Sequence, residues 1–354
     1  MASSSGSPIR IAVAGGGYGS KVPLPVYSEL SEFEPIGVWS QRDERASELA
    51  SEAGLEVGTT SLDELLSAPG LEAVHVATPV ALHEEFAMAV LERGLHLVCE
   101  KPLAGDLTGA RRIAEAVRAA GVVCVVNYGR RMQEARERLL ELVREVAGRP
   151  RFASVSLVHS DHADPDSRSF SWVEDAAMGG GRLQAYGVHD LDLLLEALGE
   201  VESVAAAADV AVPERPDGDG MRPVTAEDGY AIVCRPREGG IAVITMVSTA
   251  RHGRGDVIEV YGEQGTVCLD AERRLWWGRA GEELTCEGPL EASSKDAFRR
   301  LALAFHAAVR HGEPPDPSLE EALRVQAFFD AVHQAAAERR WVEVERMPAD
   351  AGVA

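Results

Sequence analysis

Short apolar runs alternate with amphipathic segments over the first third of the chain, from residue 9 to about residue 127. Apolar residues in the longer segments recur with helical spacing, and several segments end at a glycine. This alternation predicts a parallel sheet wrapped by helices. The expected strands are IRIAVAG (9–15), PIGVW (35–39), EVGTT (56–60), AVHVAT (73–78), LHLVCE (95–100) and VVCVV (122–126). The expected helices are RDERASELASEAG (42–54), SLDELLSA (61–68), ALHEEFAMAVLERG (81–94) and DLTGARRIAEAVRAAG (106–121).

A different pattern follows a helix expected from about Gln133 to Val146. Longer β-rich stretches begin at residue 151, and the separators REGG and GEQG between them are typical of hairpins. One helix interrupts these stretches in GGGRLQAYGVHDLDLLLEALG (179–199), and two more are expected near residues 295–311 and 318–338. The pattern predicts a second, α+β domain built on a large, mostly antiparallel open sheet.

Composition limits the classes of protein that the chain can belong to. It has 354 residues, of which 45% are hydrophobic and 26% charged, and its formal net charge is -22. No apolar run approaches the roughly 18 residues of a membrane span, and the acidic excess disfavours nucleic acid and anionic membranes as partners. The first residues contain no apolar signal core, so we expect a loose N-terminal tail and a cytoplasmic protein. The five widely spaced cysteines indicate buried thiols, not disulfides.

The first expected strand runs into a glycine-rich loop, Gly15-Gly16-Gly17-Tyr18-Gly19-Ser20. It fits the pattern G-x-G-x-x-[G/A], except that Ser20 takes the third small position. Glycines between a strand and a helix let backbone N–H groups approach a pyrophosphate. The loop alone also fits a tight turn, but its context predicts a dinucleotide site that includes Gly15, Gly17, Tyr18, Gly19 and Ser20.

The end of the second expected strand decides which dinucleotide is favoured. An acid there typically binds the ribose 2'-hydroxyl of NAD, whereas hydroxyl and arginine groups accept the 2'-phosphate of NADP. The sequence reads Trp39-Ser40-Gln41-Arg42-Asp43. Ser40 and Arg42 therefore favour NADP, and Asp43 leaves NAD open.

Four motifs in order, VAGGGYGS, VATPVALH, VCEKPLA and GGGRLQAYGVHDLD, resemble those of the Gfo/Idh/MocA family, and the resemblance covers nearly the whole chain. It implies an α/β protein with an N-terminal Rossmann domain, which we assign to residues 1–128. Residues 129–354, including the closing helices, would form a substrate-binding and oligomerisation domain. It also implies NAD(P)-dependent redox chemistry on sugars or polyols, and a homo-oligomer, either a dimer or a tetramer.

Lys101 is the first candidate catalytic residue. The chain has only three lysines among its 35 basic residues, and this one follows an apolar run in Glu100-Lys101-Pro102. A lysine that is partly buried beside a cationic nicotinamide can act as a base, which arginine cannot. In the family, the lysine of this motif lies near the substrate oxygen, so Lys101 is the expected general acid/base and Glu100 an expected cofactor neighbour.

His189 is the second candidate, because the resemblance implies a histidine here that faces the nicotinamide and assists the proton transfer. A lone histidine would more often be a core residue. Many relatives carry an aspartate four residues earlier, on the same helix face, where this chain has Ala185. The absence puts in doubt the usual lysine–aspartate–histidine triad and an inositol-like substrate.

Weaker candidates surround these two. Thr78, Pro79 and His83 match the family segment beside the nicotinamide ribose, although His83 also fits an exposed helix position. Trp172 is expected either to stack on a sugar or to be buried. Arg131 is expected either to bind substrate or to form an ion pair. We expect no metal, because His159 and His162 are too few ligands.

The leading hypothesis is thus an NADP-dependent oxidoreductase that acts on a sugar- or polyol-like hydroxyl or ketone. Two alternatives stay open at this point. One is a non-catalytic dinucleotide-binding sensor or scaffold, which Ala185 favours and the retained Lys101 and His189 disfavour. The other is a lyase or hydrolase that uses bound dinucleotide for transient oxidation.

Overall fold

The computed structural model describes residues 7–347, so most of the expected N-terminal tail lies outside the described residues. Contacts divide the chain into two compact units. Unit 1 contains the residues up to Met132 together with Ser293–Leu323, and unit 2 contains Gln133–Ala292 together with the residues from Arg324 onward. Among the described residues, no helix is long and apolar enough to cross a membrane.

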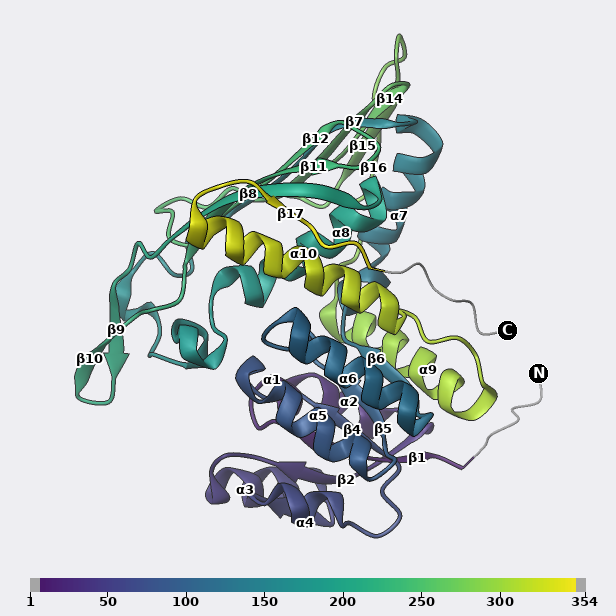
Figure 1. Cartoon of the computed structure of the whole chain (residues 1–354), viewed down its shortest axis with the longest axis vertical. Coiled ribbons are helices and arrows are strands. Elements are labelled where there is room, and N and C mark those ends of the chain that lie inside the picture. Colours follow the sequence, from purple (N-terminus) through teal and green to yellow (C-terminus); the bar gives the residue numbers. More distant parts are fainter. Residues whose placement is uncertain (1–6, 348–354) are drawn as a thin grey trace. The chain divides into compact units, whose positions relative to one another are not determined.

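Unit 1 is built on a six-stranded parallel sheet with the order β3-β2-β1-β4-β5-β6 (Figure 1). Every strand expected in this part of the chain is present. The strands are β1 (Ile9–Ala14), β2 (Phe33–Trp39), β3 (Val57–Thr59), β4 (Ala73–Val76), β5 (His96–Cys99) and β6 (Cys124–Val126). The helices are α1 (Tyr18–Lys21), α2 (Pro23–Glu29), α3 (Asp43–Ala53), α4 (Leu62–Leu66), η1 (Val80–Leu82), α5 (His83–Glu92), α6 (Leu107–Ala120), η2 (Gly129–Met132) and α9 (Ser294–His311).

Helix α6 shows how local sequence fixes these elements. Asp106 accepts a hydrogen bond from Gly109 N at 2.7 Å, which caps the first turn. Ile113 and Val117 lie on the buried face, four residues apart. Gly121 ends the helix with φ 65°, a left-handed conformation that glycine adopts without a Cβ clash.

Helix α9 packs on the sheet of unit 1, although it follows unit 2 in the sequence. Phe298, Leu301 and Phe305 belong to one buried cluster with Ile9 and Ile11 of β1. Our sequence-based division assigned this helix to the second domain. An apolar stripe at i, i+3 and i+7 predicts that a helix is buried but does not identify the sheet that covers it.

Unit 2 contains a nine-stranded sheet with the order β16-β15-β14-β13-β7-β12-β11-β8-β17. It is mostly antiparallel, as expected, and only β7 and β12 pair in parallel. The strands are β7 (Pro150–Val158), β8 (Val201–Asp209), β11 (Gly229–Pro236), β12 (Ile241–Val247), β13 (Gly255–Gly262), β14 (Gly265–Leu269), β15 (Leu275–Arg279), β16 (Thr285–Glu287) and β17 (Val342–Glu343). A separate hairpin, β9 (Glu214–Asp217) and β10 (Gly220–Pro223), projects from the unit (Figure 1).

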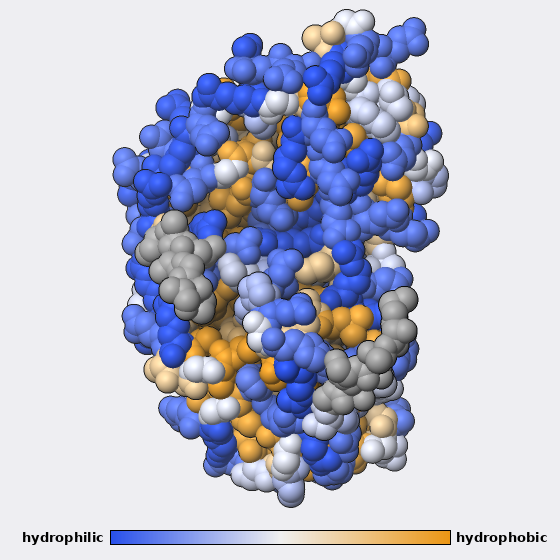
Figure 2. All heavy atoms as spheres, turned by 90° about the vertical axis from the view of Figure 1, so that its right-hand side faces the viewer, coloured by the Kyte–Doolittle hydropathy of each residue, from blue (hydrophilic) through white to orange (hydrophobic). Residues whose placement is uncertain are grey.

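Helices cover one face of this sheet, and α7 and the turn that follows it contact β14 and β15. The helices of this part are α7 (Glu134–Leu142), η3 (Val143–Ala147), η4 (Pro165–Ser167), η5 (Trp172–Glu174), η6 (Ala176–Met178), η7 (Leu183–Gly187) and α8 (Val188–Leu198). Helix α10 (Leu319–Glu338) begins in unit 1 and ends in unit 2. Hydrophilic residues make up most of the face drawn in Figure 2.

Candidate active site

The candidate residues of unit 1 gather at the carboxyl edge of its sheet. All six strands are parallel, so the segments that follow them emerge at the same edge. The strand order reverses between β1 and β4, and ligands of open α/β sheets bind at such a reversal. The segments at this edge carry the glycine loop after β1, Thr78 and Pro79 after β4, Glu100 and Lys101 after β5, and Asn127 after β6.

Three of the four glycines of the loop, Gly15, Gly17 and Gly19, meet different surroundings. A Cβ at Gly15 would overlap the carbonyl oxygen of Ala77, and φ there is +152°. A Cβ at Gly19 would lie 2.8 Å from Val13 Cγ1, so this glycine lets α1 pack closely on β1. A Cβ at Gly17 would meet no described atom within 4 Å. Gly15 and Gly19 thus shape the loop, while the exposed Gly17 leaves its backbone open to a ligand.

Ser20 stabilises the loop from its third small position. Its hydroxyl lies 2.9 Å from Gly16 O and 3.0 Å from Gly17 O, and it donates to these carbonyls. Tyr18 is exposed, and its side chain forms a hydrogen bond with that of Asn127 after β6. The loop is therefore linked to the far end of the carboxyl edge.

The end of β2 lies beside the same loop. A Cβ at Gly16 would lie 2.7 Å from Ser40 Oγ, so the buried Ser40 packs directly against the loop. Arg42 precedes the first turn of α3, and Asp43 is within that turn; both are exposed. Within residues 7–347, no hydrogen bond or ion pair holds the exposed Arg42 guanidinium, so it is available to a ligand phosphate.

A buried polar network lies below Lys101. Glu100 Oε1 accepts hydrogen bonds from Asn127 Nδ2 at 2.5 Å and from His75, whose Nε2 is 3.3 Å away. The Tyr27 hydroxyl lies 3.2 Å from the other ring nitrogen of His75. Burial raises the pKa of Glu100, but the contacts with His75 and Asn127 and the charge of Lys101 outweigh it and hold the pKa below its ordinary value.

Asn127 and His75 were not among the sequence-based candidates. A signal for each exists in the sequence. Asn127 follows a buried strand directly, and His75 interrupts the apolar run AVHVAT. A polar residue at either position needs a partner, which Glu100 provides.

Lys101 is partly buried at the end of β5. Its charge lowers the pKa of both Glu100 and His83, so the amine lies within electrostatic reach of these side chains. The Glu100 carboxylate in turn favours the ammonium form of Lys101. An amine with an adjacent buried carboxylate can hold and release a proton at this edge.

His83 lies inside unit 1. It is completely buried at the start of α5, so it is not the exposed helix residue that its sequence pattern also allowed. Its ring nitrogens face two backbone carbonyls, those of Pro102 at 2.9 Å and Thr78 at 3.0 Å. Thr78 itself is buried, and its Oγ1 has no hydrogen-bond partner among the described residues. A ligand with a donor or acceptor at this point would satisfy it.

These features fit a dinucleotide. Gly17 offers open backbone where a pyrophosphate needs it, the loop follows the strand at which the order reverses, and Thr78 presents an unpaired hydroxyl on the adjacent segment. Pro79, partly buried, continues the same segment.

In unit 2, three consecutive glycines precede the helix that carries His189. Gly179 has φ 72°, and a Cβ at Gly180 would overlap the Val173 carbonyl oxygen. Gly181 has φ 114°, and a Cβ there would overlap the Glu227 carboxylate. Glu227 Oε1 accepts a hydrogen bond from Leu183 N at 2.9 Å. The glycines thus let the chain turn tightly around a carboxylate that caps the helical segment.

His189 lies in the first turn of α8 and is buried. Arg136 of α7 donates to the His189 carbonyl at 3.2 Å and to Asp192 Oδ2 at 2.6 Å. The fully buried Asp192 therefore forms a structural ion pair and does not replace the aspartate missing at Ala185.

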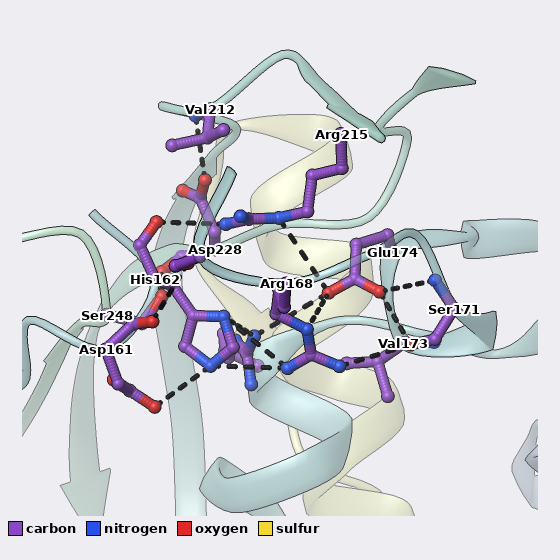
Figure 3. Close-up of polar contacts among 12 residues, drawn as sticks. Asp161, His162, Arg168, Ser171, Val173, Glu174, Val212, Arg215, Asp228 and Ser248 are labelled. Carbon is purple, nitrogen blue, oxygen red and sulfur yellow. Dashed lines mark hydrogen bonds and ion pairs between the residues drawn. The ribbon is translucent and has the colours of Figure 1, made fainter. Parts of the chain in front are cut away.

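A second polar cluster holds the irregular chain ahead of α8 (Figure 3). Glu174 lies at its centre and accepts hydrogen bonds from Ser171 N at 2.9 Å and Ser171 Oγ at 2.7 Å. Its other oxygen faces Arg168 Nε at 3.3 Å, Arg182 Nη2 at 3.9 Å and Arg215 Nε at 4.0 Å. One buried carboxylate thus balances three guanidinium groups.

His159 and His162, which are too few to form a metal site, have other partners. Arg182 donates to His162 Nδ1 at 2.7 Å, and the other ring nitrogen lies 3.0 Å from Asp161 (Figure 3). Burial and the nearby arginines lower the pKa of His162 to about 4. His159 pairs with Asp256 at 2.6 Å instead. Within residues 7–347, no three His, Cys, Asp or Glu side chains are arranged to hold a metal ion.

Trp172 and Arg131, two further candidates, have different surroundings. Trp172 is 37% exposed, so its ring is not a core side chain. Arg131 is buried, and its Nη1 lies 2.6 Å from Glu321 Oε1. This geometry favours the ion-pair alternative for Arg131 over substrate binding.

The strand order of unit 1 and the glycine loop at its reversal define a dinucleotide-binding Rossmann domain. Residues 9–128 match the model of an oxidoreductase family with an NAD-binding Rossmann fold, and residues 132–268 match the GFO/IDH/MocA C-terminal domain. The chain belongs to the Gfo/Idh/MocA family, and it is an NAD(P)-dependent oxidoreductase of that type.

Named relatives extend over almost the whole chain. Levoglucosan dehydrogenase of Pseudarthrobacter phenanthrenivorans is 27% identical, with 92% of this chain and 91% of the relative covered. An NADP(+)-dependent D-xylose 1-dehydrogenase of Haloferax volcanii is 27% identical, with 93% and 97% covered. A solved structure of levoglucosan dehydrogenase in complex with NADH and L-sorbose superposes with a TM-score of 0.86 at 24% identity, over 97% of this chain and all of that one. The likeness to that structure shows the shared fold.

Proposed function

We propose that this oxidoreductase transfers a hydride between NADP(H) and a hydroxyl or ketone of a sugar- or polyol-like substrate. Lys101 acts as the general acid/base, and His189 assists it. The observation that carries the proposal is the position of Lys101 at the carboxyl end of β5, beside the buried Glu100 carboxylate and on the sheet edge that bears the glycine loop.

The bound nicotinamide accepts the hydride in oxidation and donates it in reduction. In oxidation, the carbinol carbon loses a hydrogen with both electrons, and the neutral amine of Lys101 takes the hydroxyl proton, so that a ketone and an ammonium remain. In reduction, the ammonium returns that proton to the oxygen. The Glu100 carboxylate stabilises the ammonium in both directions.

NADP is the favoured cofactor because of the end of β2. Arg42 is an exposed cation beside the loop, and Ser40 packs against Gly16. A guanidinium and a hydroxyl suit a 2'-phosphate. Asp43 supports NAD as the second candidate, because its exposed carboxylate suits a ribose 2'-hydroxyl.

A carbohydrate-like substrate is supported by the relatives' names, which include levoglucosan and D-xylose. In this chain, the exposed Trp172 offers an aromatic face of the kind that stacks on sugar rings. The assignment of His189 rests on its place in the GGGRLQAYGVHDLD motif, and Arg136 fixes the backbone at that position.

Spectrophotometry at the nicotinamide absorbance band tests the proposal directly. The purified protein, with NADP or NAD, is assayed against a panel of sugars, polyols and keto-sugars. We expect net reduction or oxidation of the nucleotide with at least one member, and a higher kcat/KM with NADP. Product formation without any net change in the nucleotide would contradict the proposal and indicate transient redox chemistry instead.

We also propose that the protein is a homo-oligomer, either a dimer or a tetramer, that associates through the uncovered face of the nine-stranded sheet. Tyr261, Phe152 and Ile241 lie in register on the neighbouring strands β13, β7 and β12 and are 40%, 38% and 50% exposed. Three exposed apolar side chains in a row suit burial against a second copy. In sedimentation, Phe152→Glu should give a smaller species. Arg151→Glu, which alters the opposite face of the sheet, should not. An unchanged oligomer in Phe152→Glu would exclude the face that carries Phe152 as the interface.

We also propose a cytoplasmic location for the protein.

A further inference from the structure

His83 links two segments of the candidate active site. It is the first residue of α5, five residues after Thr78, and its side chain is completely buried in unit 1. One ring nitrogen, Nε2, lies 3.0 Å from the Thr78 carbonyl oxygen. The other, Nδ1, lies 2.9 Å from the carbonyl oxygen of Pro102, the residue after Lys101.

These two segments leave the sheet just before the site. β4 and β5 pair in parallel up to Val76 and Cys99, and Glu100 N still donates to Val76 O at 2.8 Å. Beyond that point the two segments diverge. The segment after β4 leads to Thr78, and the segment after β5 leads to Lys101. The His83 ring joins them again after the ladder has ended.

The chemistry of the ring makes the two contacts unequal. A carbonyl oxygen only accepts hydrogen bonds, and a neutral imidazole has one N–H donor. Burial lowers the pKa of His83, which favours the neutral ring, although the two carbonyls and Glu100 oppose this. A neutral His83 therefore donates to only one of the two carbonyls in each tautomer, so the two contacts are alternative hydrogen bonds.

We propose that His83 is a positioning residue, whose buried ring lies between the two segments and donates to Pro102 O, on the Lys101 segment, or to Thr78 O, on the cofactor-facing segment, according to its tautomer. Its function is to fix the amine relative to the bound dinucleotide without contacting either one. This role rests on the proposed function, because it assigns the reaction's proton transfer to Lys101. A displacement of about 1 Å at such a group can cost about 100-fold in rate.

Two conservative variants separate the contacts. In His83→Asn the amide nitrogen can take the place of Nδ1 and keep the Pro102 contact, whereas in His83→Gln it can take the place of Nε2 and keep the Thr78 contact. We expect Asn to retain kcat within about threefold while the Kd for NADPH rises about 10-fold. We expect Gln to retain the Kd while kcat falls about 10- to 100-fold. His96→Asn is the control for the loss of a histidine, because His96 lies at the other end of β5, away from Lys101.

A readout that needs no substrate completes the test. The chain has three lysines, so reductive ¹³C-methylation gives at most three resolved sets of lysine NMR signals. His83→Gln should move the Lys101 signal and leave those of Lys21 and Lys295 in place, which also reports that the variant is folded. Equal losses of kcat and Kd in both variants, or an unmoved Lys101 signal in His83→Gln, would overturn the role. Absence of turnover in the unaltered enzyme would instead reject the proposed function, because the NADPH affinity and the NMR signals are measured without it.

Discussion

The Asn127 side-chain amide donates to the Glu100 carboxylate at 2.5 Å, and this contact joins the carboxyl ends of β6 and β5 inside the protein. It places a fixed negative charge next to Lys101. The partners of Glu100 also make its ionisation part of the folding equilibrium.

Glu100→Gln should lower the free energy of unfolding at pH 7 by about 1–3 kcal/mol, the usual value of hydrogen bonds to a buried charged group. The folded-state pKa of Glu100 is below the ordinary 4.5, so the charged group stabilises the fold above pH 4.5. That stabilisation is lost as the pH falls through the folded-state pKa. In denaturant titrations, the difference in stability between the two proteins should therefore shrink as the pH is lowered from 7 to 3. A constant difference across this range would contradict the ionic role.

Lys101→Met should remove the proton-transfer group and retain much of the side chain's apolar volume. Turnover should fall by about 10² to 10⁴, whereas dinucleotide affinity should stay within a few-fold. Lys295→Met is the matched control, because Lys295 is exposed and pairs with Glu29 at 2.6 Å, an interaction worth little at a surface. Near-normal turnover in Lys101→Met would reject the assignment.

The glycine loop allows a paired test of shape against binding. Gly15→Ala places a Cβ against the Ala77 carbonyl at φ +152°, and we expect a loss of about 2 kcal/mol or more in stability. Gly17→Ala meets open space, so its free energy of unfolding should change by less than about 1 kcal/mol. Its Kd for the dinucleotide should nevertheless rise about 10-fold or more, as measured by calorimetry. Unchanged affinity in the folded Gly17→Ala protein would remove the loop from the binding site.

Arg42→Ala tests the cofactor preference. We expect kcat/KM with NADP to fall about 10- to 100-fold, the equivalent of losing about 1.4–3 kcal/mol of charge-assisted hydrogen bonding, while kcat/KM with NAD changes little. Arg45→Ala, in the first turn of α3, controls for the loss of a surface cation, since Arg45 pairs with Glu48. Equal effects on both cofactors would indicate that Arg42 does not bind the 2'-phosphate.

Glu174→Gln should destabilise unit 2, because it removes the carboxylate that balances three arginines. We expect a loss of about 3–5 kcal/mol, the range for breaking a buried ion pair. Glu272→Gln, at an exposed pair with Arg274, should change stability by less than about 0.5 kcal/mol. Thermal unfolding followed by calorimetry compares the two variants; a similar Tm for both would show that the cluster adds no stability.

The sequence predicts the strands of unit 1 well, because each is a short, nearly continuous apolar run bounded by polar residues. It does not predict β8, where Val204 is followed by four alanines with low strand propensity. That segment is a strand because it pairs with β11, for example Ala206 with Ile232. Pairing with a distant strand leaves no local signal.

The same limit applies to the site. Lys101 and the glycine loop are local motifs and can be read from the chain directly. The partner of Arg131 is Glu321, 190 residues away, and only the folded chain reveals that pair. Likewise the sequence predicts a helix that contains His83 but does not reveal that its ring faces two carbonyls.

Helix α9, which completes the core of unit 1 after some 160 residues of unit 2, makes that unit discontinuous in sequence. The chain leaves it and returns at neighbouring points, since Gln133 Nε2 lies 3.3 Å from Ala292 O. A fragment that stops near residue 128 would lack Phe298, Leu301 and Phe305 and expose the apolar surface that they cover. An autonomous Rossmann module therefore requires residues 293–323 to be rejoined to the first 132 by a short artificial linker.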